Sequence, residues 1–220
     1  HQLLLPVPAQ GARVGPERGA RSATANARGR RRARGPPSAP RAGGLFDSPL
    51  FAHELAAESL PSLAYVVLDP KRKKIYTQNL VPHQRVYGES LRFFDGKEYR
   101  EWSPTKSKIA AGLAKGVKGI VIREGNAVLY LGIASGTTAS HISDCVGKSG
   151  IIFGIDIAPV GMRQLVFLSH QRHNIVPLLA DAGHPEKYFY RMCQCDLLIQ
   201  DLAQKNQVDI FLNNLQFIKP

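Results

Sequence analysis

Short apolar runs separated by polar turn residues occupy the chain between residues 64 and 102. They are Ala64–Asp69, Lys73–Leu80, Gln84–Ser90 and Lys97–Trp102. Each run is rich in β-branched or aromatic residues, and Asp-Pro, Val-Pro-His and Asp-Gly sequences lie between the runs, as is typical of strands joined by turns. The pattern predicts a small antiparallel sheet, in which Asp95-Gly96 is the clearest hairpin turn.

The period of the pattern changes after Ser103-Pro104. Ile109, Leu113 and Val117 fall on one helical face, which predicts a helix over residues 107–117 with Ser103 as its cap.

Near-continuous apolar runs follow, with helical stretches between them. They are Ala127–Gly132, Ile151–Asp156, Ile175–Asp181 and Cys195–Asp201. Such runs are typical of strands that are buried on both faces of a parallel sheet, so this part of the chain is predicted to be an α/β domain.

Composition divides the chain into three parts. Residues 1–44 are rich in Arg, Gly, Ala and Pro and lack the apolar side chains that a core needs, so they are predicted to be disordered. Residues 45–102 are predicted to form the small β domain, and residues 103–220 the α/β domain. A hydrophobic content of 44% is enough to build a core in a chain of 220 residues.

The formal net charge of +12 is concentrated near the N-terminus, where nine arginines between Gln2 and Gly44 stand against one acid, Glu17. Such an excess favours a polyanionic partner, and RNA, DNA or an anionic membrane would each satisfy it. No apolar run approaches the roughly 20 residues that a membrane span requires.

The cysteines and histidines predict no metal site. Cys193 and Cys195 are the only close pair, and with Cys145 they fit neither a disulfide framework nor a complete zinc site, which favours a reducing compartment. His141 and His184 lack the Cys/His spacing of a metal site, so both are predicted to form local hydrogen bonds.

Three of the predicted parallel strands finish on a carboxylate: Asp156, Asp181 and Asp201. In an open α/β sheet, ligands bind beyond the carboxyl ends of the strands, where the strand order reverses. We therefore expect the three side chains to point into one crevice.

The first parallel strand ends in a turn that contains Gly132 and Gly136. Thr137 and Thr138 then open the next helix, and Asp156 lies 20 residues past Gly136, where an acid meets ribose hydroxyls in nucleoside-binding folds. Glycines are also used for close packing of a strand and a helix, so the turn alone is a weak signal. With the acid it favours a nucleoside ligand.

The choice of nucleoside depends on the spacing of the glycines. A dinucleotide site uses G-x-G-x-x-G around a pyrophosphate, and the middle glycine is absent from "GIASGTT". S-adenosylmethionine has no phosphate and needs acceptors for its ribose and adenine. The strand-end acids therefore favour a methyl donor, and a nicotinamide-dependent oxidoreductase is the less favoured alternative.

Five ordered blocks of the sequence resemble the fibrillarin family, the RNA 2′-O-methyltransferases of box C/D ribonucleoproteins. They are Asn79–Glu89, Glu98–Leu113, Val128–Asp144, Asn174–Pro185 and Asp196–Gln207, and the resemblance runs from about residue 64 to the end. It implies a Rossmann-like, seven-stranded methyltransferase sheet preceded by a small β domain, with S-adenosyl-L-methionine as cofactor.

The resemblance also implies site residues. The donor contacts are Gly132, Gly136, Thr137, Thr138, Asp156, Ile157, Asp181, Ala182, Asp201, Leu202, Ala203 and Gln204. Lys108 and Asp201, with a further lysine, are implied to orient the ribose 2′-hydroxyl and to assist its deprotonation. Without the resemblance, Lys108 would be interpreted as an exposed helix lysine.

The implied partners are a box C/D guide RNA, a substrate rRNA or tRNA and a Nop-family scaffold protein. The implied compartment is the cytoplasm in an archaeal host, or the nucleus and nucleolus in a eukaryotic one. Family members continue into strands that carry the further lysine, so we expect the C-terminal strands to be missing from this chain. That leaves open a catalytically inactive RNA–protein assembly subunit as the alternative.

Overall fold

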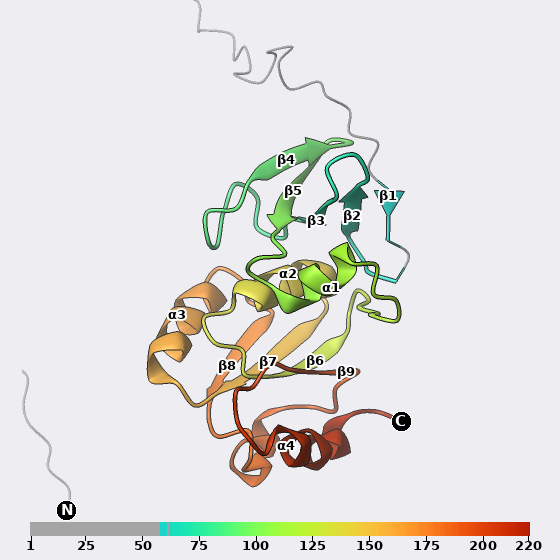
Figure 1. Ribbon diagram of the computed structural model, residues 1–220. Coiled ribbons are helices and arrows are strands. Elements are labelled where there is room, and N and C mark those ends of the chain that lie inside the picture. Colours follow the sequence, from blue (N-terminus) through green and yellow to red (C-terminus); the bar gives the residue numbers. More distant parts are fainter. Residues whose placement is uncertain (1–57, 61) are drawn as a thin grey trace, which may run out of the picture. The chain divides into compact units, whose positions relative to one another are not determined.

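The computed structural model describes residues 58–60 and 62–220 (Figure 1). The predicted disordered tail and residues 45–57 of the predicted β domain lie outside the described residues. The described residues belong to one compact unit.

Five antiparallel strands form the first sheet. They are β1 (Glu58–Ser59), β2 (Val66–Asp69), β3 (Lys74–Gln78), β4 (Leu91–Phe94) and β5 (Lys97–Trp102), in the order β1-β2-β3-β5-β4. The sequence predicts a small antiparallel sheet here but no strand at β1 or β4. β4 and β5 are joined at Asp95 and Gly96, whose φ angles of 48° and 70° are both positive, as a tight two-residue hairpin requires. The predicted hairpin turn is confirmed.

The strand predicted over Gln84–Ser90 is wrong, because this segment curls into a turn. The side chain of Glu89 accepts hydrogen bonds from the backbone amides of Val86 at 3.0 Å and Tyr87 at 2.8 Å, and Gly88 has a φ of 83°. Local side-chain acceptors of this kind compete with pairing into a sheet.

Four parallel strands form the second sheet, which confirms the predicted α/β fold. They are β6 (Ala127–Leu131), β7 (Ile151–Asp156), β8 (Ile175–Leu179) and β9 (Leu197–Gln200), in the order β8-β7-β6-β9. β7 and β8 lie on one side of β6 and β9 lies on the other. The strand order therefore reverses at β6, where such folds bind ligands.

Helices cover both faces of the parallel sheet. They are α1 (Lys108–Ala114), α2 (Thr137–Val146), α3 (Pro159–Ser169) and α4 (Gln207–Asn214), with short 3₁₀ turns η2 (Pro185–Lys187), η3 (Phe189–Arg191) and η4 (Leu215–Phe217). α1, α2 and α3 lie on the side that faces the antiparallel strands, and α4 lies on the opposite side (Figure 1). No helix within residues 58–60 and 62–220 is both long and apolar enough to cross a bilayer.

The predicted cap of the first helix is wrong by one turn. Ser107, and not Ser103, is the N-cap of α1, and its hydroxyl accepts a hydrogen bond from the amide of Ala110 at 3.3 Å. Ser103 instead lies close to Thr105, with 2.9 Å between their hydroxyl oxygens.

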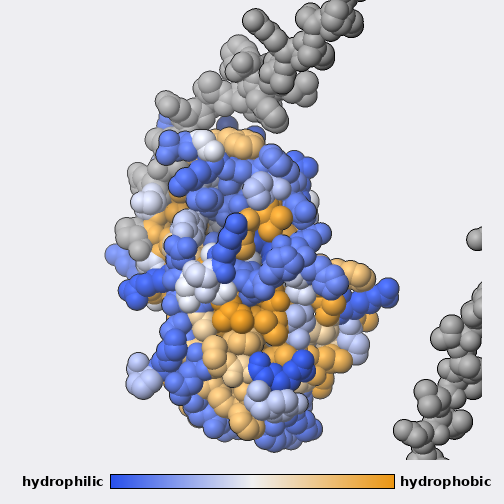
Figure 2. All heavy atoms as spheres, turned by 180° about the vertical axis from the view of Figure 1, so that it is seen from behind, coloured by the Kyte–Doolittle hydropathy of each residue, from blue (hydrophilic) through white to orange (hydrophobic). Residues whose placement is uncertain are grey.

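Apolar side chains remain on the surface of α4. Only Ile210 and Asn214 of this helix are buried, whereas Val208 is 66% and Leu212 is 57% exposed. Seen from behind, apolar surface gathers on the lower, parallel-sheet part of the molecule, and the upper part is mostly polar (Figure 2).

A buried polar interface joins the antiparallel sheet to α2. Its centre is Asp144, which accepts hydrogen bonds from the Thr77 hydroxyl at 2.7 Å, the Leu80 amide at 2.9 Å and the Arg172 guanidinium at 2.6 Å. Arg100 lies 3.4 Å from the same carboxylate. Each buried charge is therefore paired, which such groups require.

His141 belongs to this interface and is fully buried. Its ring lies 2.7 Å from the Thr77 hydroxyl and 2.7 Å from the Tyr87 hydroxyl, and it stacks on Trp102 with 5.2 Å between ring centroids. Burial, with the nearby charges of Arg100 and Arg172, lowers the pKa of His141 well below its usual value. These local hydrogen bonds agree with the prediction for this residue.

Acidification is expected to destabilise the chain through His141. Because its pKa is lower in the folded than in the unfolded chain, the unfolded chain binds one more proton as the pH falls below 6.5. The stability is fully present above that pH, and each unit below it costs about 1.4 kcal/mol of unfolding free energy. Urea denaturation across this window measures the slope.

The matched controls are His141→Gln and His170→Gln. The first is expected to flatten the pH dependence, and the second to retain it because His170 is exposed. An unchanged slope in His141→Gln would contradict this assignment.

Candidate active site

The carboxyl ends of the parallel strands surround a cavity of about 320 Å³. Asp156 is the last residue of β7, Asp181 follows β8 and Asp201 directly follows β9, and all three line this cavity. The expectation that the strand-end acids converge is confirmed.

Nine of the predicted donor contacts line the crevice. They are Gly132, Asp156, Ile157, Asp181, Ala182, Asp201, Leu202, Ala203 and Gln204. Ala134, Ile155 and Ala180 also line it and were not predicted from the sequence. Apolar residues in or beside strand ends carry no distinctive chemical signal, so the sequence does not single them out.

The two glycines of the turn make close contact with different parts of the fold. Gly132 has a φ of 78°, and a Cβ there would lie 2.5 Å from the backbone carbonyl oxygen of Asp201. Gly136 has a φ of 88°, and its Cβ would meet the side chains of Leu165 and Leu168 at 2.6 and 2.7 Å. Gly132 therefore lets the turn touch the end of β9, and Gly136 lets α2 pack against α3.

The side chain of Asp156, at the end of β7, hydrogen-bonds to the glycine turn. Its two carboxylate oxygens accept hydrogen bonds from the amides of Ala134 and Ala158, each at 2.8 Å. A carboxylate has about four acceptor positions, so two remain for ligand hydroxyls. The short Asp side chain is thus oriented by the backbone on both sides.

Acceptors are also available elsewhere in the crevice. One oxygen of Asp181 accepts the amide of Gly183 at 2.8 Å, which leaves the other free of a protein donor within the described residues. Gln204 presents a buried side-chain oxygen for which the described part of the chain supplies no donor. Buried acceptors without partners are costly, and a ligand with N–H or O–H groups would satisfy them.

Lys108 and Asp201 form an ion pair at the mouth of the crevice. Lys108 is the first residue of α1, and its side chain is 83% exposed, whereas that of Asp201 is 34% exposed. Burial raises the pKa of the Tyr130 hydroxyl in β6 to about 12, and the Asp201 carboxylate raises this pKa further. Lys108 is thus an exposed helix lysine, as the sequence alone suggests, and it is also paired with Asp201.

Lys219 lies at the amino-terminal end of β9, opposite the crevice. Its ammonium donates to Asp196 at 2.7 Å, and Asp196 directly precedes β9, whereas Asp201 directly follows it. Lys219 therefore takes no part in the crevice.

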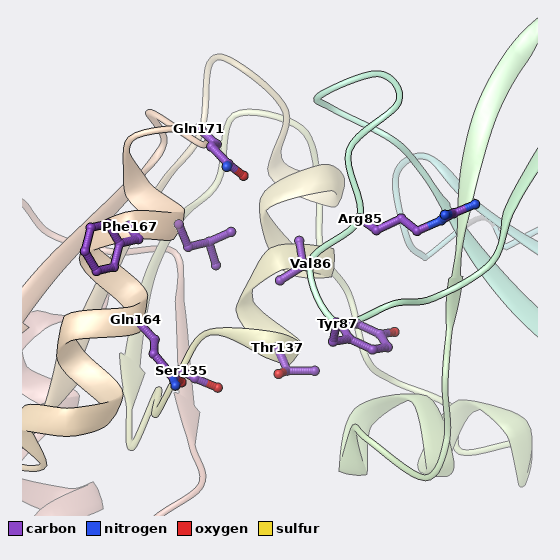
Figure 3. A pocket seen from close by; sticks show the side chains of 9 residues that line it. Arg85, Val86, Tyr87, Ser135, Thr137, Gln164, Phe167 and Gln171 are labelled. Carbon is purple, nitrogen blue, oxygen red and sulfur yellow. The ribbon is translucent and has the colours of Figure 1, made fainter.

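Thr137 lies beside a second hollow and not in the crevice. This hollow, of about 460 Å³, lies between α3 and the segment Arg85–Tyr87, with Ser135 and Thr137 at its edge (Figure 3). Gln164 and Gln171 of α3 also line it. Thr138 lines neither cavity, and Gly136 is buried in the packing of α2 on α3.

The charges of the crevice discriminate between ligands. It is lined by three carboxylates, of which Lys108 pairs with one from outside the lining, so the surrounding stays net negative. It therefore repels the pyrophosphate of a dinucleotide and favours a sulfonium cation with hydroxyl and amino groups. These donors match the acceptors of the crevice. Within residues 58–60 and 62–220, no group of three His, Cys, Asp or Glu side chains is placed to hold a metal ion.

The strand order, the glycine turn and the acidic crevice define a Rossmann-like domain of the S-adenosylmethionine-dependent methyltransferase class. Comparison with known proteins narrows this class. The fibrillarin family model matches residues 59–220, and the chain belongs to the fibrillarin family.

Three relatives illustrate the match. The fibrillarin-like rRNA/tRNA 2′-O-methyltransferase of Thermococcus gammatolerans is 48% identical over 160 residues, which cover 72% of this chain and 71% of the relative. Aeropyrum pernix fibrillarin, solved with natively bound S-adenosyl-L-methionine, superimposes with a TM-score of 0.69 and 43% identity over 75% of this chain and 73% of that one. Fibrillarin in a solved fibrillarin/Nop5p complex superimposes with a TM-score of 0.59 and 41% identity over 67% and 66%.

Proposed function

We propose that this chain is an S-adenosylmethionine-dependent RNA 2′-O-methyltransferase that acts on rRNA or tRNA paired to a box C/D guide RNA. The observation that carries the proposal is the convergence of Asp156, Asp181 and Asp201 on the glycine turn, with Lys108 paired to the last of these acids. The names of the similar proteins support the same activity and substrate class.

The donor is held by residues at the ends of three strands. When bound, S-adenosylmethionine supplies a methyl group carried on a sulfonium sulfur. In this proposal Asp156 and Ile157 hold its ribose, Asp181 and Ala182 lie at its adenine, and residues 201–204 hold its methionine portion. The unpartnered oxygen of Gln204 is an acceptor for that portion.

Asp201 and Lys108 act on the ribose of the RNA. A neutral 2′-hydroxyl is a poor nucleophile, so a carboxylate oxygen of Asp201 accepts its proton, and the ammonium of Lys108 stabilises the negative charge on the ribose oxygen. Their ion pair keeps both groups at one place on the crevice mouth. The exposure of Lys108 leaves that side open to a large substrate.

The partners follow from the chemistry of the substrate and from the related complex. A Nop-family scaffold is proposed because a similar chain was solved bound to Nop5p. A guide RNA is proposed because the crevice residues are assigned to the methyl donor and to the reacting ribose, so selection of the nucleotide is left to base pairing. The formal net charge of +12 suits an RNA partner.

The proposal is tested by methyl transfer to defined RNA. The full chain is mixed with a Nop-family scaffold, a box C/D guide RNA, a complementary RNA and labelled S-adenosylmethionine. One 2′-O-methylated nucleotide is expected within the guide pairing, and a 2′-deoxy substitution at that nucleotide is expected to abolish transfer. Label that survives the deoxy substitution, or that is found on a base, would overturn the proposal.

A further inference from the structure

The antiparallel sheet reaches the first turn of α2 through one arginine. Arg100 of β5 is fully buried, and one nitrogen of its guanidinium donates to the hydroxyl of Ser140 at 2.8 Å. That hydroxyl in turn donates to the backbone carbonyl of Thr137, also at 2.8 Å. Two hydrogen bonds therefore connect β5 with the residue at which α2 begins.

The start of α2 depends on this support because it has no side-chain cap. Its N-cap is Gly136, with a φ of 88°, and no side chain of the described residues caps the first amides. A Ser, Thr or Asp cap would normally stabilise such an end. Here the turn from Gly132 to Gly136 is held from the crevice side by Asp156 and from the other side by α2.

Arg100 is itself paired with two buried carboxylates. Its Nε lies 2.8 Å from the buried carboxylate of Glu89, and a terminal nitrogen lies 3.4 Å from Asp144. Glu89 is fixed by the amides of Val86 and Tyr87. A guanidinium paired with two buried carboxylates loses little further freedom when it binds the serine, so it orients that hydroxyl at low entropic cost.

We propose that Arg100 and Ser140 are positioning residues for the methyl donor. They fix the first turn of α2 and hence the glycine turn. The small antiparallel sheet therefore contributes to donor binding by positioning this turn. The inference rests on the proposed function, because it takes the glycine turn to be the donor-binding turn. Neither residue touches the crevice, so both act through the backbone.

Ser143 provides a matched control on the same helix. It is as fully buried as Ser140 and lies one turn further along. Its hydroxyl donates to Asn174 at 2.7 Å and accepts from Arg172 at 3.1 Å, so it also makes two hydrogen bonds, but away from the glycine turn. Ser140→Ala and Ser143→Ala thus each remove two buried hydrogen bonds, from successive turns of α2.

The test compares these two variants in the full chain. Urea denaturation measures stability, and calorimetry measures the Kd of S-adenosylmethionine. Both variants are expected to lose similar stability. Ser140→Ala is expected to raise the donor Kd and KM by about tenfold, as expected for loss of a buried hydrogen-bond tether, with kcat nearly unchanged. Ser143→Ala is expected to leave the donor Kd within about twofold of wild type, because neither hydrogen bond of its hydroxyl reaches the glycine turn.

Two further measurements keep the inference falsifiable. In the ligand-free chain, Ser140→Ala is expected to speed amide hydrogen exchange in the peptide that spans residues 132–139, and Ser143→Ala is not. Arg100→Lys keeps the positive charge near Glu89 but loses the guanidinium arm, and it is expected to raise the donor Kd like Ser140→Ala.

The outcomes separate this inference from the proposed function. Equal donor affinity in wild type and Ser140→Ala, or an equal loss in both serine variants, would overturn the inference alone. A wild-type chain that binds no donor would overturn the proposed function and the inference together.

Discussion

Replacing Asp201 with alanine is expected to reduce methyl transfer by about 10²–10⁴-fold, the usual contribution of a positioned general base. The carboxylate lies directly after β9 and pairs with Lys108, so its loss removes both the proton acceptor and the group that orients the lysine. Single-turnover transfer to guide-paired RNA measures the effect. Donor affinity is expected to change by less than about tenfold, because the neighbouring backbone of the crevice remains.

Controls separate this effect from a general loss of charge. Asp209→Ala removes an exposed acid from α4 and is expected to leave transfer unchanged. Lys108→Met is expected to lower transfer, and the double variant with Asp201→Ala is expected to be no worse than the poorer single variant, since the pair acts as a unit. Strictly additive losses would contradict a joint role.

Replacing Gly132 with alanine is expected to abolish measurable donor binding. The added Cβ would lie 2.5 Å from the carbonyl oxygen and 2.8 Å from the carbonyl carbon of Asp201, so either the turn or the end of β9 must move. The left-handed conformation adds about 1–2 kcal/mol of strain for a residue with a side chain. Calorimetry with S-adenosylmethionine and urea denaturation measure the two consequences.

Gly116 provides the matched control for this substitution. It has a φ of 79°, close to that of Gly132, but a Cβ there would meet nothing within 4 Å. Gly116→Ala is therefore expected to cost only the strain of the left-handed conformation and to retain donor binding. If Gly132→Ala bound the donor like Gly116→Ala, the close approach of turn and strand would not matter for the site.

The parallel sheet and its acids were predictable because their signals are local. Each buried strand is a continuous apolar run, and parallel strands place their carboxyl ends at one edge, so the convergence of Asp156, Asp181 and Asp201 follows from the pattern. The same type of pattern gave a wrong strand prediction for the segment Gln84–Ser90. Its β-branched and aromatic residues favour a strand, but the carboxylate of Glu89 binds the local amides and closes a turn.

Other features depend on contacts between segments that are distant in the sequence. Composition and periodicity do not predict such contacts. Lys108 and Asp201 are 93 residues apart in the chain, and on sequence grounds alone the lysine resembled any exposed helix lysine. Arg100 and Ser140 are 40 residues apart, and only the folded chain shows that they meet. Long-range polar contacts of this kind leave no periodic pattern in the sequence.

The most direct test of the account is calorimetric titration of the wild-type chain with S-adenosylmethionine, with NAD⁺ titrated in parallel. Three carboxylates, only one of them paired with a lysine, predict one S-adenosylmethionine bound per chain and no detectable NAD⁺ binding. Binding of NAD⁺ without binding of S-adenosylmethionine would contradict the account, because the crevice would then accept the pyrophosphate that its charges should repel.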